Sequence, residues 1–245
     1  MRNYDKPPIE EAIIEIRFQN NFSSKVVAAV KSKIGKRYAK SEDLNNFEFA
    51  VSIQNGVPSN NLKPKSKGVK FSSEDASEYF TFNELNAFAT NRAPYVGWEV
   101  FSNRAIRDFD DVLKQMPNNK IGRIGIRFVN RLDIPTLGQA AVNVKEYLEI
   151  YPNIPVDLCP INIQALTQVI YKIPETQWTC QLLTVKVDSP LIDHVAIKLD
   201  IDVSLDGELP QKTTGIQEIV NEGRRLKNIV FERLITDKAR ELFQL

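Results

Sequence analysis

Three arginines stand at every fourth position of one short segment: Arg123, Arg127 and Arg131. The segment alternates apolar and polar residues, a pattern typical of a half-buried β-strand, so residues 121–134 are expected to form a strand with the three guanidinium groups on one face. Guanidinium groups donate hydrogen bonds in a planar fork that suits phosphate and carboxylate oxygens. Such a row could therefore hold the phosphates of a nucleic acid or an acidic surface of a protein partner.

The same arginines have an internal alternative. Residues 11–20 form a second alternating run, which predicts a strand with Glu11, Glu15 and Arg17 on its polar face. If the two strands lie side by side, Glu11 and Glu15 would neutralise the arginine row through cross-strand ion pairs. The sequence leaves both interpretations open, an arginine row free for a ligand and one paired inside the protein.

A second basic feature is the segment 55–67, which holds two prolines and three lysines and almost no large apolar residue. This composition predicts an exposed loop. Its lysines, Lys63, Lys65 and Lys67, would extend a basic binding surface begun by the arginine row and Arg17.

Catalytic signatures are few in this sequence. His194 is the sole histidine, so any histidine-based triad or metal site would have to be built around it, and its place beside Asp193 indicates a turn or surface residue. The chain has no phosphate-binding glycine loop, no nucleophile elbow and no zinc-protease motif. The sequence therefore predicts no catalytic residue, no metal site and no cofactor.

Acidic residues and cysteines allow weaker alternatives. Asp200 and Asp202 share a strand face and could hold Mg²⁺, although Lys198 on the same face favours a solvated, ion-paired surface. Cys159 and Cys180 do not have the spacing of a metal site or a redox pair, and we expect two reduced, buried thiols.

Bulk composition is that of a globular chain, with 245 residues, 42% hydrophobic and 26% charged. The net charge of +1 provides no overall field to recruit nucleic acid or anionic lipid, so such binding would need a local patch. No apolar run approaches the ~18 residues that a membrane span requires, and the first residues lack a secretory core. We expect a cytoplasmic protein with no membrane association.

Hydrophobic periodicity predicts an α+β protein. Helices are expected at 23–38, at 98–116 and from a capping box at Thr214, with short helical turns at 143–150 and after Thr236. Strands are expected at 11–20, 47–54, 68–73, 78–90, 121–134, 161–173, 177–187 and 194–205.

The two halves follow one order of elements. Five residues of the first strand recur 110 positions later, where Ile14, Ile16, Arg17, Phe18 and Asn20 match identical residues of the arginine-row strand. We therefore expect duplicated β-α-β(3–4)-α units, residues 1–118 and 119–245, packed as one globular unit. Antiparallel sheets would carry long helices on one face.

Three segments carry a resemblance to a known family: 7–18, 123–131 and the end of the last helix from Phe231 to Asp237. With these segments the chain resembles a family of uncharacterised, sporadically distributed bacterial proteins of similar length. The resemblance implies a shared fold and a bacterial context, and it brings no activity, cofactor or catalytic residue. Patchy distribution is typical of mobile or defence-associated genes.

Three functions remain after these considerations. The first is a non-enzymatic binding or accessory protein that acts through a protein partner, in a bacterial defence or toxin-antitoxin-like setting. The second is a nucleic-acid-binding protein that uses Arg123, Arg127 and Arg131. The third is an enzyme of unrecognised type, which would need a pocket with polar groups of perturbed pKa.

Overall fold

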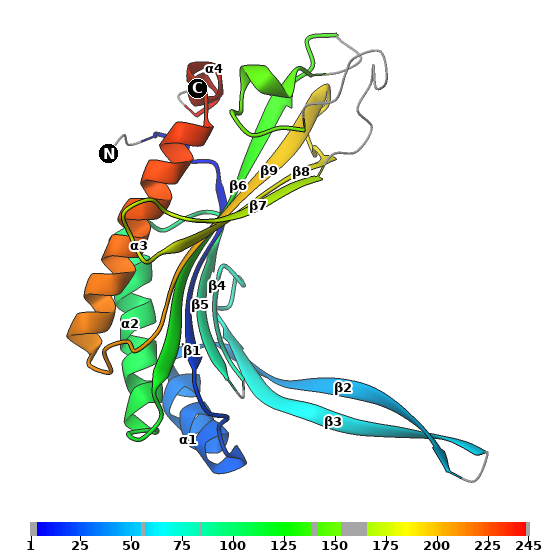
Figure 1. The fold of residues 1–245 in the computed structure, drawn as a ribbon, viewed down its shortest axis with the longest axis vertical. Helices are drawn as coiled ribbons and strands as arrows, with labels where there is room; N and C mark the ends of the chain where they lie inside the picture. The colour runs from blue at the N-terminus through cyan, green and yellow to red at the C-terminus, as the bar shows by residue number, and fades with distance from the viewer. Residues whose placement is uncertain (1–3, 55–56, 84, 139–141, 153–165, 244–245) are drawn as a thin grey trace.

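The computed structural model describes residues 4–54, 57–83, 85–138, 142–152 and 166–243, with the backbone alone for Ser24, 45–54 and 57–67. Within these ranges the chain forms a nine-stranded antiparallel sheet, and the long helices pack on one face of it (Figure 1). The expected α+β class is confirmed. The strands form one continuous sheet to which both halves of the chain contribute.

The strands are β1 Ile9–Phe18, β2 Lys40–Gln54, β3 Val57–Ser72, β4 Glu78–Phe82, β5 Asn86–Arg92, β6 Ile121–Pro135, β7 Leu166–Lys172, β8 Thr179–Asp188 and β9 His194–Asp206. The helices are α1 Ser24–Ile34, α2 Trp98–Lys114, α3 Thr213–Leu234 and α4 Asp237–Glu241, with 3-10 turns η1 Gly35–Arg37 and η2 Val144–Glu146. The sheet order is β2-β3-β4-β5-β1-β6-β9-β8-β7. The first strand of each half therefore lies at the centre.

The two central strands form as their alternation predicts. Ile14 and Ile16 of β1 and Ile124 and Ile126 of β6 are fully buried on the helical side, while the residues between them face the other way. Burial of each such side chain contributes about 1.5–3 kcal/mol. The apolar faces of the two strands thus fix which side of the sheet receives the helices.

The register between β1 and β6 has a twofold character. Glu15 pairs with Gly125, and on either side Ile14 pairs with Ile126 and Ile16 with Ile124. The offset of 110 residues makes Ile14 the counterpart of Ile124 and Ile16 the counterpart of Ile126. Each of these isoleucines therefore pairs with the counterpart of the other one, as a twofold axis through the Glu15–Gly125 pair would produce.

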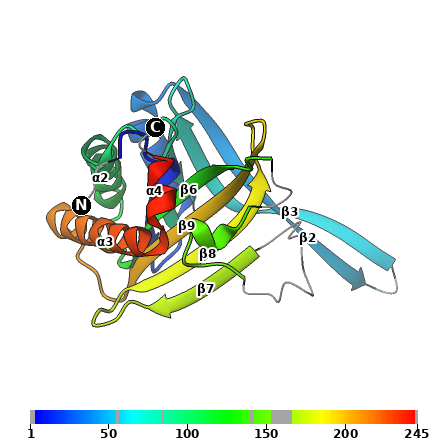
Figure 2. The same ribbon diagram turned by 90° about the horizontal axis from the view of Figure 1, so that it is seen from above.

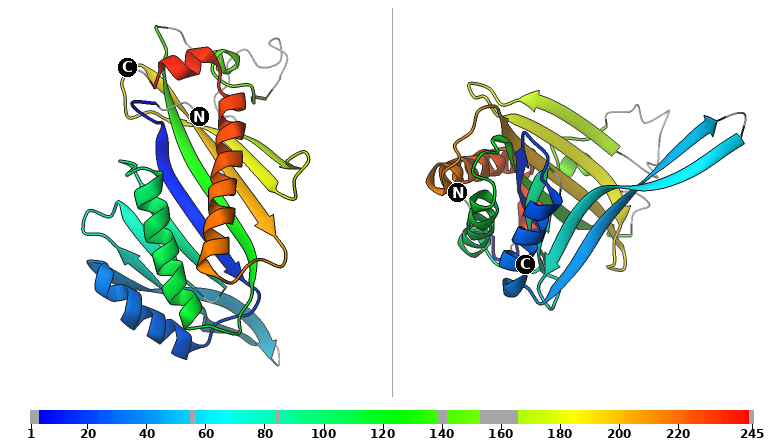
Figure 3. Two further views of the ribbon diagram at one scale, coloured as in Figure 1. Left: turned by 90° about the vertical axis from the view of Figure 1, so that its left-hand side faces the viewer. Right: turned by 90° about the horizontal axis from the view of Figure 1, so that it is seen from below.

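Helices α2 and α3 lie across the central strands, as Figure 3 shows. The expected apolar stripe of α2 is buried, with Phe101, Ala105 and Val112 at 0% exposure. Where α3 crosses the sheet it has a glycine, and a Cβ at Gly223 would lie 2.3 Å from Ile126 Cδ1. Only a residue without a side chain allows this approach.

The helix starts follow the sequence in part. Ser23 caps α1, where its side chain accepts from Val26 N, and Thr236 caps α4 in the same way. The capping box expected at Thr214 is wrong, because α3 begins one residue earlier, after Lys212, without a side-chain cap. The first turn is anchored instead to α2, since the Thr213 hydroxyl donates to Asp110 at 2.7 Å.

The loop expected at 55–67 is wrong for residues 57–67, which belong to β3. This strand pairs with β2 along its whole length in a hairpin that extends away from the remaining sheet (Figure 2). Its pairing with β4 begins only at Val69, so Pro58 and Pro64 lie where β3 has a neighbour on one side. A strand tolerates proline at such an edge, because no hydrogen bond is needed there.

Other expected strands also have different limits, since the strand expected at 11–20 is β1 Ile9–Phe18 and the strand expected at 47–54 begins at Lys40 as β2. The run 78–90 is divided into β4 and β5, because the Asn83 side chain accepts from the backbone of Leu85 and Asn86 and reverses the chain. The strand expected at 161–173 is present from Leu166 onward as β7, and its first five positions lie outside the described residues.

Candidate functional site

The face of the sheet opposite the helices, called here the open face, carries the arginine row. Within the described residues no helix packs on it (Figure 1). Alternation along β1, β6 and β9 directs polar side chains to this face, so arginines of β6 meet carboxylates of both neighbouring strands. The polar residues concerned are Glu15, Arg17, Arg123, Arg127, Arg131, Lys198, Asp200 and Asp202.

Arg123 lies at the centre of an ion cluster. Its guanidinium donates to Glu15 Oε2 at 3.0 Å and to Asp202 Oδ2 at 3.1 Å. Burial raises the pKa of Asp202, and Arg123 acts in the opposite direction. A Cβ at Gly125 would stand 3.4 Å from Glu15 Oε2, so a long side chain there would displace this carboxylate.

Arg127 and Arg131 also have partners. Arg127 Nε donates to both carboxylate oxygens of Asp200, at 2.9 and 3.1 Å, and this hydrogen bond raises the pKa of the arginine. Arg131 donates to Asp133 at 3.1 Å and to the Asp188 carbonyl at 3.1 Å. Arg127 is the most accessible of the row, with 47% of its side chain exposed against 17% for Arg123.

The carboxylates that pair with the arginine row are only in part those expected from the sequence. Glu15 faces the row as expected, whereas Glu11 pairs with Arg92 of β5 at 3.1 Å. Asp200 and Asp202, considered as Mg²⁺ ligands, are instead hydrogen-bonded by Arg127 and Arg123. Their oxygens are thus occupied by guanidinium groups.

A depression of about 510 Å³ lies on the open face beside Arg127. Its charged residues form three pairs, Glu10 with Lys198 at 2.8 Å, Glu11 with Arg92, and Asp200 with Arg127. Three acids and three bases leave the depression without net charge. Its apolar part consists of Val129, Leu183 and Val185.

The remaining basic residues lie apart from this depression. Arg17 is half exposed and donates to Asn86 Oδ1 and Glu15 Oε1, both at 3.1 Å. Lys63, Lys65 and Lys67 lie on β3 within the hairpin, and their side chains are outside the described part of the structure. The structure thus joins Arg17 to the arginine row through Glu15.

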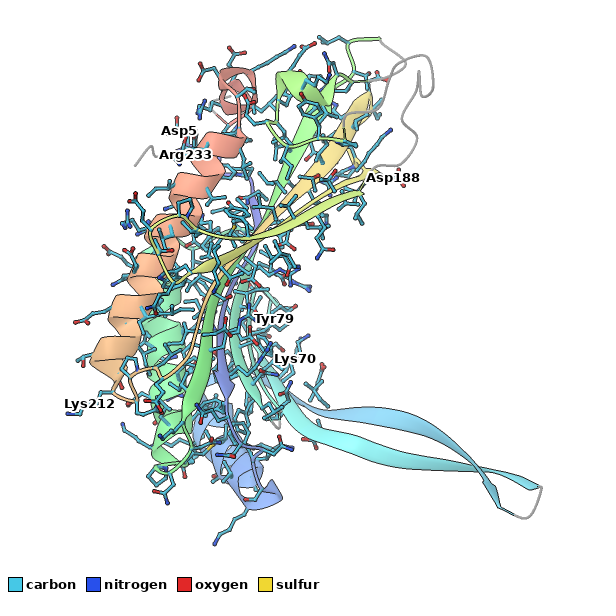
Figure 4. The ribbon with its side chains drawn as sticks, in the orientation of Figure 1. Asp5, Lys70, Tyr79, Asp188, Lys212 and Arg233 are labelled. Carbon is cyan, nitrogen blue, oxygen red and sulfur yellow. The ribbon has the colours of Figure 1, made fainter. Side chains whose placement is uncertain are left out.

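Lys70 and Tyr79 lie on the β3–β4 side of the sheet, as Figure 4 shows, with the ammonium 4.1 Å from the ring centroid. His194 Nδ1 donates to the Ile192 carbonyl at 2.7 Å, as expected for a turn residue. Cys180 is a buried free thiol whose pKa is raised to about 11 by burial, and Cys159 lies outside the described residues. None of these groups contacts the arginine row.

The comparisons with known proteins leave the site to be judged on its geometry. No family model and no curated protein matches this chain. Among the described helices, none is both long and apolar enough to cross a membrane.

The sequence interpretation missed a second site, on the helical side of the sheet. There Lys227 of α3 is only 4% exposed and lines a pocket with Trp98 and Phe128. Lys227 follows Gly223 by four residues and precedes Val230 by three, so it belongs to the apolar stripe of α3. This helical spacing is the signal that could have identified it.

Proposed function

We propose that this protein is a non-enzymatic module that binds a protein partner through the open face. The observation that carries the proposal is the depression beside Arg127, where apolar Val129, Leu183 and Val185 are surrounded by paired charges. Protein interfaces combine an apolar centre with a polar rim and are enriched in arginine. A second protein could bury these apolar groups while the ion pairs fix its orientation.

Charge balance favours a protein over a nucleic acid. Binding to phosphates is driven by release of counterions and requires a local excess of lysine and arginine. Each arginine of the row already contacts a carboxylate, so a phosphate would have to displace Glu15, Asp200 or Asp133. The arginine row therefore gives the nucleic-acid alternative no independent support.

We also propose that the sheet arose by duplication of one unit. The crosswise pairing of β1 with β6 supports this origin. The sheet order supports it too, because in each half the first strand is central, the last strand lies next to it and the second strand is at the edge. A duplicated fold with diverged central strands would explain why the acidic residues of β1 face the arginines of β6. Recombinant halves 1–118 and 119–245 that associate into one native-like complex would support this origin.

The binding proposal is tested by comparing two substitutions of exposed or partly exposed apolar residues. Leu183→Glu adds a charge to the depression, whereas Val100→Glu adds one to the exposed side of α2. Affinity purification with quantitative mass spectrometry should recover the same partner with the wild type and Val100→Glu. The partner should be reduced at least tenfold with Leu183→Glu.

Two results would contradict the proposal. One is recovery of the partner by Leu183→Glu at the wild-type level. The other is salt-dependent binding of a random oligonucleotide that Arg127→Glu abolishes, since this outcome would assign the open face to nucleic acid.

A further inference from the structure

A pocket of about 360 Å³ lies on the helical side of the sheet, opposite the open face. Four segments form its walls: the N-terminal segment from Tyr4 to Ile9, the turn of Tyr95 and Trp98 before and at the start of α2, Phe128 and Asn130 of β6, and α3 from Arg224 to Glu232. Small-molecule sites in proteins occupy about 300–1,000 Å³, so the volume suits a compact ligand.

Aromatic rings give the pocket a flat apolar lining. The Phe128 ring lies 6.3 Å from Trp98 and 5.9 Å from Tyr95, measured between ring centroids. Trp98 is held in place because its Nε1 donates to Asn221 Oδ1 at 3.1 Å. Rings fixed in this way favour a planar hydrocarbon group between or beside them.

Lys227 places a buried amine in the same pocket. Its Nζ lies 3.8 Å from the Phe128 centroid and 5.8 Å from that of Phe231. No carboxylate among the described residues forms an ion pair with it. The nearby Glu232 is engaged elsewhere, since its carboxylate accepts from Tyr4 Oη at 2.8 Å and from Arg240 Nε at 3.3 Å.

A second cation stands at the pocket. The Arg224 guanidinium lies 5.1 Å from the Trp98 centroid. Burial lowers the pKa of Lys227 to about 7, and Arg224 acts in the same direction while Glu232 opposes it. The pocket thus holds two cationic side chains and one carboxylate that is already hydrogen-bonded.

We propose that this pocket binds a small carboxylate-bearing molecule with an aromatic body. The carboxylate contacts Lys227 and Arg224, and the ring packs against Trp98 and Phe128. A bound anion supplies the paired counter-charge that Lys227 lacks among the described residues, and the aromatic body packs against the rings that line one part of the pocket. The site is separate from the proposed partner surface, because it lies on the other face of the sheet.

The probes are benzoate, phenylacetate and 3-phenylpropionate, with the corresponding uncharged amides as controls, and binding is measured by isothermal titration calorimetry at pH 6. The best carboxylate should bind at least tenfold more tightly than its amide. Lys227→Met should reduce its affinity at least tenfold and Arg224→Gln a few-fold. Lys212→Gln, at the exposed start of the same helix, should leave the affinity unchanged.

The wild type also provides a test that needs no substitution. Affinity for the carboxylate should fall as pH rises above about 7, because the anion prefers the protonated amine. Among the described residues, the other charged or titratable groups that line this pocket are Arg224, Glu232, Tyr4 and Tyr95. Arg240 donates to Glu232. The pKa of Tyr4 and that of Tyr95 are both raised by burial, so neither hydroxyl titrates between pH 6 and 9.

Any of three results would overturn the proposal. They are equal affinity for a carboxylate and its amide, unchanged binding by a folded Lys227→Met variant, and affinity that does not vary between pH 6 and 9. Absence of saturable binding by all three carboxylates would also overturn it. Because the pH series uses the wild type, a variant that fails to fold leaves the question decidable.

Discussion

The two faces of the sheet treat charge in opposite ways. On the open face Arg123, Arg127 and Arg131 each contact a carboxylate, and the depression beside them contains as many acids as bases. On the helical side Lys227 is more deeply buried than any of these arginines, yet it pairs with no carboxylate of the described residues.

This difference separates two roles for a buried charge. A charge with its partner in place stabilises one register of the strands and offers a rigid, neutral surface to a second protein. A charge without a partner disfavours the unliganded fold and gains most when a ligand brings the opposite charge. The same sheet therefore carries paired charges on one side and, within the described residues, a buried amine without a paired carboxylate on the other.

The largest expected effect comes from removing the partner of two carboxylates. Arg123→Met would leave Asp202 without its hydrogen-bonded cation and Glu15 with Arg17 alone, and the free energy of unfolding at pH 7 should fall by about 3–5 kcal/mol. Urea denaturation measures this change. Arg17→Met is the matched control on the neighbouring strand, and because Arg17 is half exposed it should cost less than ~1 kcal/mol.

The pH dependence of the Arg123→Met variant gives a further check. The pKa of Asp202 is already raised by burial, and loss of Arg123 should raise it further. A carboxyl group whose pKa is higher in the folded state binds protons preferentially in that state, so the variant should recover stability as pH falls below 7. A loss no greater than that of Arg17→Met, or one independent of pH, would mean that the cluster is not coupled.

The second largest effect is a gain in the free energy of unfolding. Lys227→Met removes a buried ammonium and should stabilise the unliganded protein by about 2 kcal/mol at pH 6, after allowance for the lost contact with Phe128. The folded-state pKa is lowered to about 7, so only the unfolded chain stays protonated above that pH. Wild-type stability should therefore rise with pH, and the advantage of the variant should shrink by up to about 1.4 kcal/mol per pH unit.

Thermal or urea unfolding of the wild type and of Lys227→Met from pH 6 to 9 measures how the difference in their stability changes with pH. A variant that is less stable than the wild type at pH 6, by an amount that does not change with pH, would show that Lys227 is neutral or has a partner in the folded state.

The smallest expected effect tests how far Arg224 contributes to the lowered pKa of Lys227. Arg224→Gln removes the nearby cation that disfavours the protonated form of Lys227. The pKa of Lys227 should therefore rise by less than about one unit, which corresponds to a free-energy change below ~1.4 kcal/mol. Arg225→Gln is the control, because Arg225 points to solvent and pairs with Glu222 at 2.7 Å. An equal shift in the two variants would mean that the field of the whole helix acts, and not Arg224 in particular.

Much of the sheet was predictable because most positions of its central strands alternate between apolar and polar residues. In β1 and β6 each apolar residue between two polar ones is buried, so the faces of these strands and the side that receives the helices follow from period alone, whereas β1 begins and ends two residues before its expected limits. The row of arginines on one face was predictable for the same reason. Their partners were predictable only in part, since Asp200 and Asp202 come from β9, about 75 residues further along the chain, and sequence does not state which strands are neighbours.

The β2–β3 hairpin was not predictable in its outer part. Residues 57–67 have the prolines, asparagines and lysines of a loop, and local propensity favours no strand there. Their pairing with β2 is a long-range property, continued outward from the inner register at Ser41 and Phe71. Local composition thus gave the wrong structure where cross-strand pairing decided it.

The pocket on the helical side could be predicted only as a core position. Lys227 falls in the apolar stripe of α3, but its proximity to Trp98 and Phe128 depends on the close approach of α3 to β6 at Gly223. That approach joins residues separated by more than 90 positions. The chemistry of the pocket is a product of packing, which no local pattern records.

The central claim, that Lys227 forms no ion pair with a carboxylate of the described residues, is tested most directly by its own titration. Carbon-13 NMR of protein labelled at lysine Cε, with Lys227→Met to assign the signal, gives the pKa with and without saturating 3-phenylpropionate. The account predicts a pKa of about 7 in the free protein, raised when the carboxylate binds. A free-state pKa near 10.5, or one that the carboxylate does not change, would contradict it.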